Sequence, residues 1–171
     1  MEGKNQLILV NEKDEQVGIA DKTTAHLQGM LHRAFSIFLF NSNNELLLQQ
    51  RALHKYHTPG LWTNTCCSHP YDGEVIEDAA LKRLEVEMGI SASLEKVFHF
   101  QYKSVLPNGL IEHELDHVFI GKFSDKPNIN PDEAMAWKYM PLDAIETEIE
   151  KTPEKYTPWF KIILPKLKAY M

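Results

Sequence analysis

The sequence has 171 residues, of which 43% are hydrophobic and 25% are charged, so we expect one domain spanning residues 1–171 with its own core. Its formal net charge is −6 and no basic stripe is visible, which argues against a nucleic-acid partner. No apolar run is long enough to cross a bilayer and no signal peptide is recognisable. We therefore expect no membrane association and a cytoplasmic location.

The pattern of apolar residues in the first half of the chain predicts strands. Short apolar segments at residues 7–10 and 17–20 are typical of strands, and segments 34–40 and 45–50 flank a polar turn in the pattern of a hairpin. Residues 56–71 contain Pro59, Gly60 and Pro70 and predict a loop. This loop holds the only cysteines, Cys66 and Cys67. Neighbouring cysteines rarely form a disulfide, so they are either small buried residues or thiols available for chemistry.

The second half mixes helices and strands. Apolar residues recur every fourth position from Ile76 to Met88, which predicts a helix over residues 75–88 ending at Gly89. Extended segments follow at 94–103, 110–123 and 132–140. Residues 142–150 and 159–170 predict helices, with interruptions at Pro158 and Pro165. A strand-rich order with one central helix indicates an α+β sandwich and not a doubly wound sheet.

Three carboxylates, Glu112, Glu114 and Asp116, alternate along the segment 110–123 and would share one face of a strand. Taken alone, this pattern favours an exposed polar face, and the alternative is a metal site. His26, His32 and His69 could complete a mixed imidazole and carboxylate site. The other histidines are expected to be structural or surface residues: His54, His57, His99, His113 and His117.

Residues 68–90 partly match the Nudix motif, a glycine and glutamate followed by a helix with an arginine, glutamates and a glycine. Glu74, Glu87 and Gly89 stand at matching positions, as do Leu84 and Ile90 at the apolar ones. The remaining signature positions are changed, to Ser68, Lys82, Arg83 and Val86. The frame of the motif is retained while most of its metal-binding glutamates are lost. A surface ion pair between Arg83 and Glu87 is the simpler interpretation of that helix face.

Five blocks in order carry a more specific resemblance: LHRAFSIFLF at 31–40, QRALHK at 50–55, PGLWTNTCCSHP at 59–70, EHE at 112–114 and TPWF at 157–160. Together they resemble the type I isopentenyl diphosphate isomerases of the Nudix superfamily. The resemblance implies a Nudix-like α/β/α sandwich with a mixed sheet. It also implies the interconversion of isopentenyl and dimethylallyl diphosphate through a tertiary carbocation. The substrate, a small isoprenoid diphosphate, would be the partner.

The resemblance also implies a role for individual residues. The acid–base pair would be Cys67 and Glu114, with Tyr102 beside the glutamate. A divalent metal (Zn²⁺, Mn²⁺ or Mg²⁺) would be bound by His26, His32, His69, Glu112 and Glu114. The substrate would be bound by Lys22, Arg51, Lys55, Arg83 and Trp159, and Glu87 would help to hold a Mg²⁺ ion that accompanies the diphosphate.

Two other functions remain open at this stage. A Nudix hydrolase would attack the diphosphate linkage with metal-activated water. A non-catalytic phosphate or metal sensor would use the same frame without needing Cys67. The role of Trp62 also remains open, since its ring could either cover the carbocation or pack in the core.

Overall fold

The computed structural model describes residues 6–55 and 57–171. The strands are β1 (Gln6–Val10), β2 (Gln16–Asp21), β3 (His32–Phe40), β4 (Glu45–Arg51), β5 (Trp62–Thr63), β6 (Cys66–Ser68), β7 (Glu95–Val105), β8 (Ile111–Lys122) and β9 (Ala134–Pro141). The helices are α1 (Lys22–Gln28), α2 (Ile76–Met88), α3 (Leu142–Lys151) and α4 (Pro158–Tyr170), with a 3₁₀ turn, η2, at Pro153–Lys155. Each predicted strand or helix is present, with its ends within two residues of the expected ones.

Strand β3 is the centre of a mixed sheet. It pairs in parallel with β8, from His32 opposite Glu114 to Phe40 opposite Lys122, and antiparallel with β1, β4 and β6. Because side chains alternate along a strand, β3 contributes apolar residues to both faces of the sheet. A strand that is buried on both faces reads as a nearly continuous apolar run, which is the pattern of residues 34–40.

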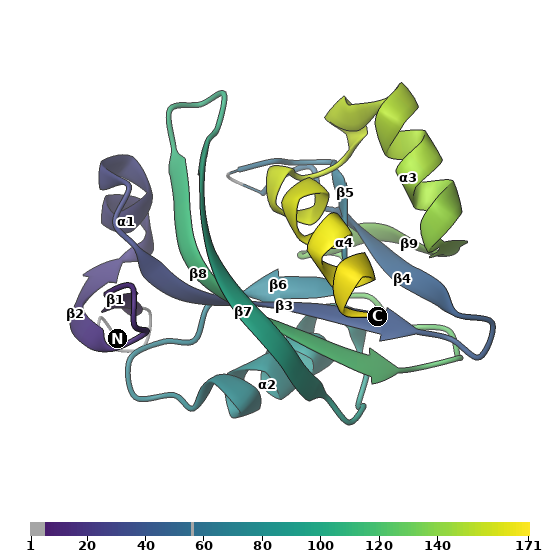
Figure 1. Cartoon of the computed structure of the whole chain (residues 1–171), viewed down its shortest axis with the longest axis horizontal. Helices are drawn as coiled ribbons and strands as arrows, with labels where there is room; N and C mark the ends of the chain where they lie inside the picture. The colour runs from purple at the N-terminus through teal and green to yellow at the C-terminus, as the bar shows by residue number, and fades with distance from the viewer. Residues whose placement is uncertain (1–5, 56) are drawn as a thin grey trace.

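Helices cover both faces of the sheet (Figure 1). Helix α4 packs Phe160 and Ile163 against Phe38 of β3 on one face. Helix α2 packs Leu84 and Met88 on the opposite face. The expected α+β sandwich with a mixed sheet is confirmed.

One helix was not predicted, and two local predictions were wrong. Residues 22–28 form helix α1, which begins after the capping side chain of Asp21 and ends at Gly29 with φ 66°. The segment expected to be a loop contains β5 and β6, while its first residue, Tyr56, lies outside the described residues. Neither Pro158 nor Pro165 breaks α4. A proline is well tolerated in the first helical turn, and Pro165 stands between the buried Leu164 and Leu167, which hold the helix against the core.

The segment before β9 caps the end of α2. Asn128 and Asn130 donate their backbone N–H groups to the carbonyls of Met88 and Glu87, at 2.9 Å each. These bonds satisfy helix carbonyls that would otherwise have no partner within the helix. Glu87 and the segment that ends in Glu133 are thereby fixed beside one another. Within the described ranges, no helix is long and apolar enough for a membrane span.

Candidate active site and metal centre

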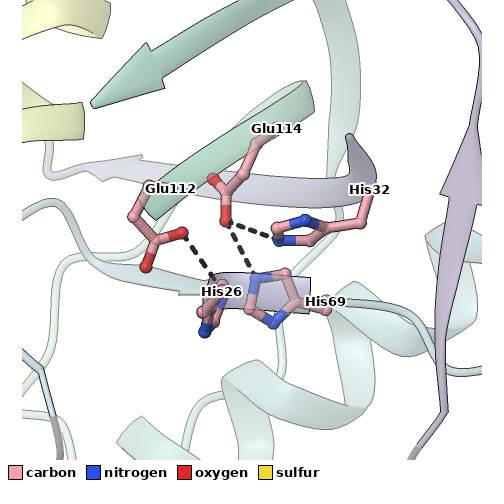
Figure 2. A group of neighbouring side chains, drawn as sticks. All are labelled: His26, His32, His69, Glu112 and Glu114. Atoms are coloured by element: carbon pink, nitrogen blue, oxygen red, sulfur yellow. Dashed lines mark hydrogen bonds and ion pairs between the residues drawn. The ribbon is translucent and has the colours of Figure 1, made fainter. Parts of the chain in front are cut away.

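Three imidazoles and two carboxylates meet between β8, the start of β3 and helix α1 (Figure 2). One ligand atom from each residue lies within 4.8 Å of all the others, and the set is His26, His32, His69, Glu112 and Glu114. These are the five residues that the sequence resemblance predicts as metal ligands. The structure therefore brings the complete predicted set together into a group that could hold a metal ion.

The pairing of strands explains this convergence. The parallel register of β3 and β8 sets His32 opposite Glu114, and the two-residue period of β8 places Glu112 on the same face. His69 directly follows β6, whose last residue pairs with β3. His26 comes from the last turn of α1. Glu112, Glu114 and Asp116 are only 2%, 7% and 1% exposed, so the interpretation of this strand face as an exposed polar surface is wrong.

The contacts within the cluster favour the presence of a positive charge. Glu114 Oε2 lies 2.9 Å from His69 Nε2 and 3.4 Å from His32 Nε2. His32 Nδ1 lies 2.9 Å from the carbonyl of Met30, and a carbonyl can only accept, so Nδ1 carries the ring proton. In the neutral ring, the Nε2 lone pair then faces a carboxylate. Either a second ring proton or a bound cation relieves this repulsion, so the donor set fits a divalent metal.

Burial keeps two of the imidazoles in the neutral form that ligates metals. It lowers the pKa of His26 to about 4 and the pKa of His69 well below its ordinary value. Burial alone would raise the pKa of Glu114, but the contacts with His32 and Tyr102 outweigh it and hold that pKa at about 2. The carboxylate of Glu114 is therefore ionised at neutral pH.

A cavity of about 720 Å³, including the solvent at its mouth, opens beside the cluster. Cys67 and Glu114 both line this cavity. Cys66 points to the opposite face of the sheet, where it packs in the core beneath helix α2. Burial raises the pKa of Cys67 to about 12, with Arg51 opposing the rise, so its sulfur carries a proton at neutral pH. Tyr102 lies behind Glu114 and donates its hydroxyl to Oε1 at 2.5 Å.

All the predicted substrate-binding residues line this cavity: Lys22, Arg51, Lys55, Arg83 and Trp159. Burial lowers the pKa of Lys22, and the positive charges of Lys55 and Arg51 lower it further. Cations that repel one another inside a cavity favour an anionic ligand. Glu133, which no sequence pattern singled out, lies 2.9 Å from Lys55 Nζ and 3.3 Å from Arg83 Nη2.

Glu87 and Arg83 also face the cavity from α2. Their ion pair, 2.5 Å between Arg83 Nη2 and Glu87 Oε2, is the simpler feature that the sequence suggested for this helix. Gln49 Nε2 lies 3.3 Å from Glu87 as well. Val86, at one of the changed signature positions, is exposed. The cavity-facing side of α2 thus pairs a glutamate with an arginine where the Nudix motif has further glutamates.

Two residues, His57 and Asp116, differ from their sequence-based assignments, and Trp62 fits one of its two alternatives. His57, expected among the structural or surface histidines, is 5% exposed and lines the cavity. Trp62 packs against the α4 core, with Lys138 Nζ 4.3 Å from its ring centroid, which agrees with core packing. Asp116 follows Glu112 and Glu114 along β8 and is buried, and its carboxylate accepts a hydrogen bond of 2.8 Å from the Ser36 hydroxyl.

Comparison with known proteins agrees with this arrangement. Residues 30–160 match the family model of the NUDIX domain. Among solved structures, DR0079 from Deinococcus radiodurans superposes with a TM-score of 0.80 at 20% identity, covering 94% of this chain and 98% of its own. A MutT protein from Methanosarcina mazei gives a TM-score of 0.68 at 13% identity, covering 81% and 94%. The chain has the fold of a NUDIX protein.

Two curated relatives narrow the class. The "Isopentenyl-diphosphate Delta-isomerase" of Serratia proteamaculans (strain 568) is 50% identical over 163 residues, covering 95% of this chain and 91% of the relative. "Isopentenyl-diphosphate Delta-isomerase 2" of Aromatoleum aromaticum (strain DSM 19018 / LMG 30748 / EbN1) is 49% identical over 164 residues, covering 96% and 87%. This chain belongs to the isopentenyl-diphosphate Delta-isomerase family. The names of these relatives favour the predicted isomerase over the Nudix hydrolase.

Proposed function

We propose that this protein interconverts isopentenyl diphosphate and dimethylallyl diphosphate, with Cys67 and Glu114 as the acid–base pair. The observation that supports the proposal most is the shared cavity. A thiol and an ionised carboxylate line it, a potential metal centre adjoins it and four cationic side chains surround it. A hydrolase would instead need the glutamates of α2 to activate water, and Arg83 and Val86 stand where those glutamates would be.

The reaction moves one double bond by two proton transfers. A proton is added to the terminal carbon of the alkene, which creates a tertiary carbocation. A second proton then leaves the carbon on the other side of the cationic centre. An acid and a base that line one cavity can perform both steps, and their roles exchange in the reverse direction.

The two proposed groups start in complementary protonation states. The pKa values of about 12 for Cys67 and about 2 for Glu114 leave the proton on sulfur and the charge on oxygen. Tyr102 holds Glu114 Oε1 through its hydroxyl and so fixes the orientation of the carboxylate. Trp159 also lines the cavity, and an aromatic face can stabilise a desolvated cation by about 2 kcal/mol.

The diphosphate would be held by the four cationic side chains that line the cavity, Lys22, Arg51, Lys55 and Arg83, which together form a cationic wall. Arg51 and Arg83 can bind phosphate oxygens in pairs, whereas Lys22 and Lys55 act as point charges. Glu87, which lies next to Arg83, would help to hold a Mg²⁺ ion with the diphosphate. Binding energy from this remote group can orient the alkene between acid and base.

We further propose that the enzyme depends on the metal. His26, His32, His69, Glu112 and Glu114 would bind Zn²⁺, Mn²⁺ or Mg²⁺. The bound ion supplies positive charge that fixes the carboxyl group of Glu114 and changes its proton affinity. Removing divalent ions with a chelator should abolish activity, and adding them back should restore it. Full activity in a preparation shown to be metal-free would refute this dependence. A catalytic thiol also needs a reducing compartment, in keeping with a cytoplasmic enzyme.

The reaction itself is tested by incubating the protein with isopentenyl diphosphate and Mg²⁺ and recording proton NMR spectra. We expect dimethylallyl diphosphate to form, and in D₂O we expect deuterium to enter the substrate carbons. Release of phosphate without the dimethylallyl product would establish the hydrolase instead.

The role of Cys67 separates the enzyme from a non-catalytic sensor. Cys67→Ala removes the proposed proton donor, so turnover should be lost while the fold and metal binding are retained. Cys66→Ser is the matched control because Cys66 lies on the other face of the sheet, and a hydroxyl can keep the contact of 3.5 Å that its sulfur makes with Glu87 Oε1. This variant should keep its activity. Substantial turnover by Cys67→Ala would contradict the acid–base assignment.

A further inference from the structure

His57 connects the potential metal centre to the cationic wall. It lies in the chain between β4 and β5 and is almost fully buried at the edge of the cavity. Its Nε2 atom lies 2.8 Å from Oε1 of Glu112. Its Nδ1 atom lies 3.0 Å from Nη2 of Arg51. One imidazole thus contacts a proposed metal ligand with one nitrogen and a proposed diphosphate ligand with the other.

These two contacts determine where the ring proton is. A guanidinium group can only donate hydrogen bonds, so Nδ1 of His57 accepts from Arg51. The proton of the neutral ring is then on Nε2, which donates it to the carboxylate of Glu112. This bond engages Oε1 of Glu112 and leaves Oε2 directed towards His26, 3.5 Å away. The tautomer therefore sets the orientation of the carboxylate inside the cluster.

The surroundings of His57 prevent the ring from turning. Arg51 Nη2 also donates to the backbone carbonyl of His57 at 3.2 Å, which ties the loop to the same guanidinium. The indole of Trp159 lies against both groups, with its ring 5.9 Å from the imidazole and 5.4 Å from Arg51 Cζ. Rotation of the imidazole would break its bonds to Arg51 and Glu112 together.

We infer that His57 is a positioning residue that orients Glu112 for the metal and Arg51 for the diphosphate, an inference that rests on the proposed function. The two sites are then joined by one side chain. A histidine hydrogen-bonded to a ligating carboxylate is expected to matter almost as much as a ligand, because loss of such a bond typically costs about 10–100-fold in metal affinity or activity.

Three variants separate the two contacts. His57→Gln keeps an amide N–H at the reach of Nε2, so it should retain Mn²⁺ affinity while raising the KM for isopentenyl diphosphate about 10-fold, the worth of one hydrogen bond. His57→Asn keeps an acceptor at the depth of Nδ1 but cannot reach Glu112. It should retain the KM and weaken Mn²⁺ binding by about 10–100-fold. His57→Phe preserves the ring volume and should show both defects.

Mn²⁺ affinity is measured by titration calorimetry, and KM by NMR. His54→Ala is the matched control. His54 anchors the same loop through a contact of 2.8 Å between its Nε2 atom and the carbonyl of Asp132, and it is not among the described residues that line the cavity. It should leave both quantities unchanged. Equal losses in His57→Gln and His57→Asn, or wild-type Mn²⁺ affinity in His57→Phe, would overturn the inference, as would a wild-type chain without affinity for Mn²⁺.

The same split can be measured without turnover. The affinity for inorganic pyrophosphate replaces the KM, so the variants decide the role of His57 even if the wild-type chain forms no dimethylallyl diphosphate. That last result would refute the proposed function alone.

Discussion

Replacing Tyr102 with phenylalanine isolates one hydrogen bond at the proposed acid–base pair. Tyr102 stands opposite Glu114 in the antiparallel register of β7 and β8 and is buried. Its hydroxyl donates to Glu114 Oε1 at 2.5 Å, and its ring stacks on Phe100 with 5.7 Å between centroids. Phenylalanine keeps the ring and this packing, so the change removes a single donor from a buried carboxylate.

The size of the effect follows from the charge on the acceptor. Hydrogen bonds to charged groups contribute about 1.5–3 kcal/mol, which corresponds to about 10–150-fold in rate if the bond is fully used in the transition state. Tyr102 is not among the described residues that line the cavity. The substitution should therefore lower kcat and leave the KM for isopentenyl diphosphate unchanged. Removal of the donor should also raise the pKa of Glu114 from about 2, because burial is then less strongly opposed.

Initial rates from proton NMR at several substrate concentrations separate kcat from KM. Tyr139→Phe serves as the control, because its hydroxyl donates to the backbone carbonyls of Phe123 and Asp125 at 3.2 and 2.8 Å, away from the cavity. This control should lose some stability and no activity. A Tyr102→Phe enzyme with wild-type kcat, or one whose defect lies in KM alone, would refute the reasoning.

Two further predictions concern stability. Gly89→Ala should cost more than the roughly 1–2 kcal/mol of a left-handed alanine, because φ is 63° and the new Cβ would lie 2.5 Å from the carbonyl oxygen of Asn128. Gly73→Ala, with φ 89° and open space around it, should pay the backbone cost alone, and equal urea midpoints would contradict this. Burial lowers the pKa of His117 from 6.5 to about 4. Its contribution to stability is therefore complete above about pH 6.5 and lost as the pH falls towards 4. His117→Asn should reduce the slope with which the urea midpoint of the metal-free protein falls across that window, while His26 and His69, whose pKa values are also lowered, maintain part of it. An unchanged slope would exclude a contribution from His117.

The framework of the fold could be predicted because it follows from apolar periodicity. The four-residue repeat ending at Gly89 marks α2, and the continuous apolar run at 34–40 marks a strand buried on both faces. The period of two along β8 correctly placed Glu112 and Glu114 on one face. Periodicity does not tell whether a face is buried, and here the parallel pairing with β3 buries those carboxylates. That pairing joins segments about eighty residues apart, which no local pattern reveals.

Two segments that contribute to the site were missed by sequence reasoning, helix α1 and the loop that holds His57, and this has a physical reason. The buried positions of α1 are Ala25 and His26, so this helix has no apolar stripe to detect, yet it supplies Lys22 to the cavity and His26 to the potential metal centre. His57 is buried by contacts with Arg51 and Glu112, which are polar. A catalytic cavity requires buried polar side chains held by one another. A segment that contributes mainly such side chains therefore lacks the hydrophobic pattern on which sequence-based prediction depends. Spatial contacts such as that of His57 with Glu112 become visible only in the folded chain.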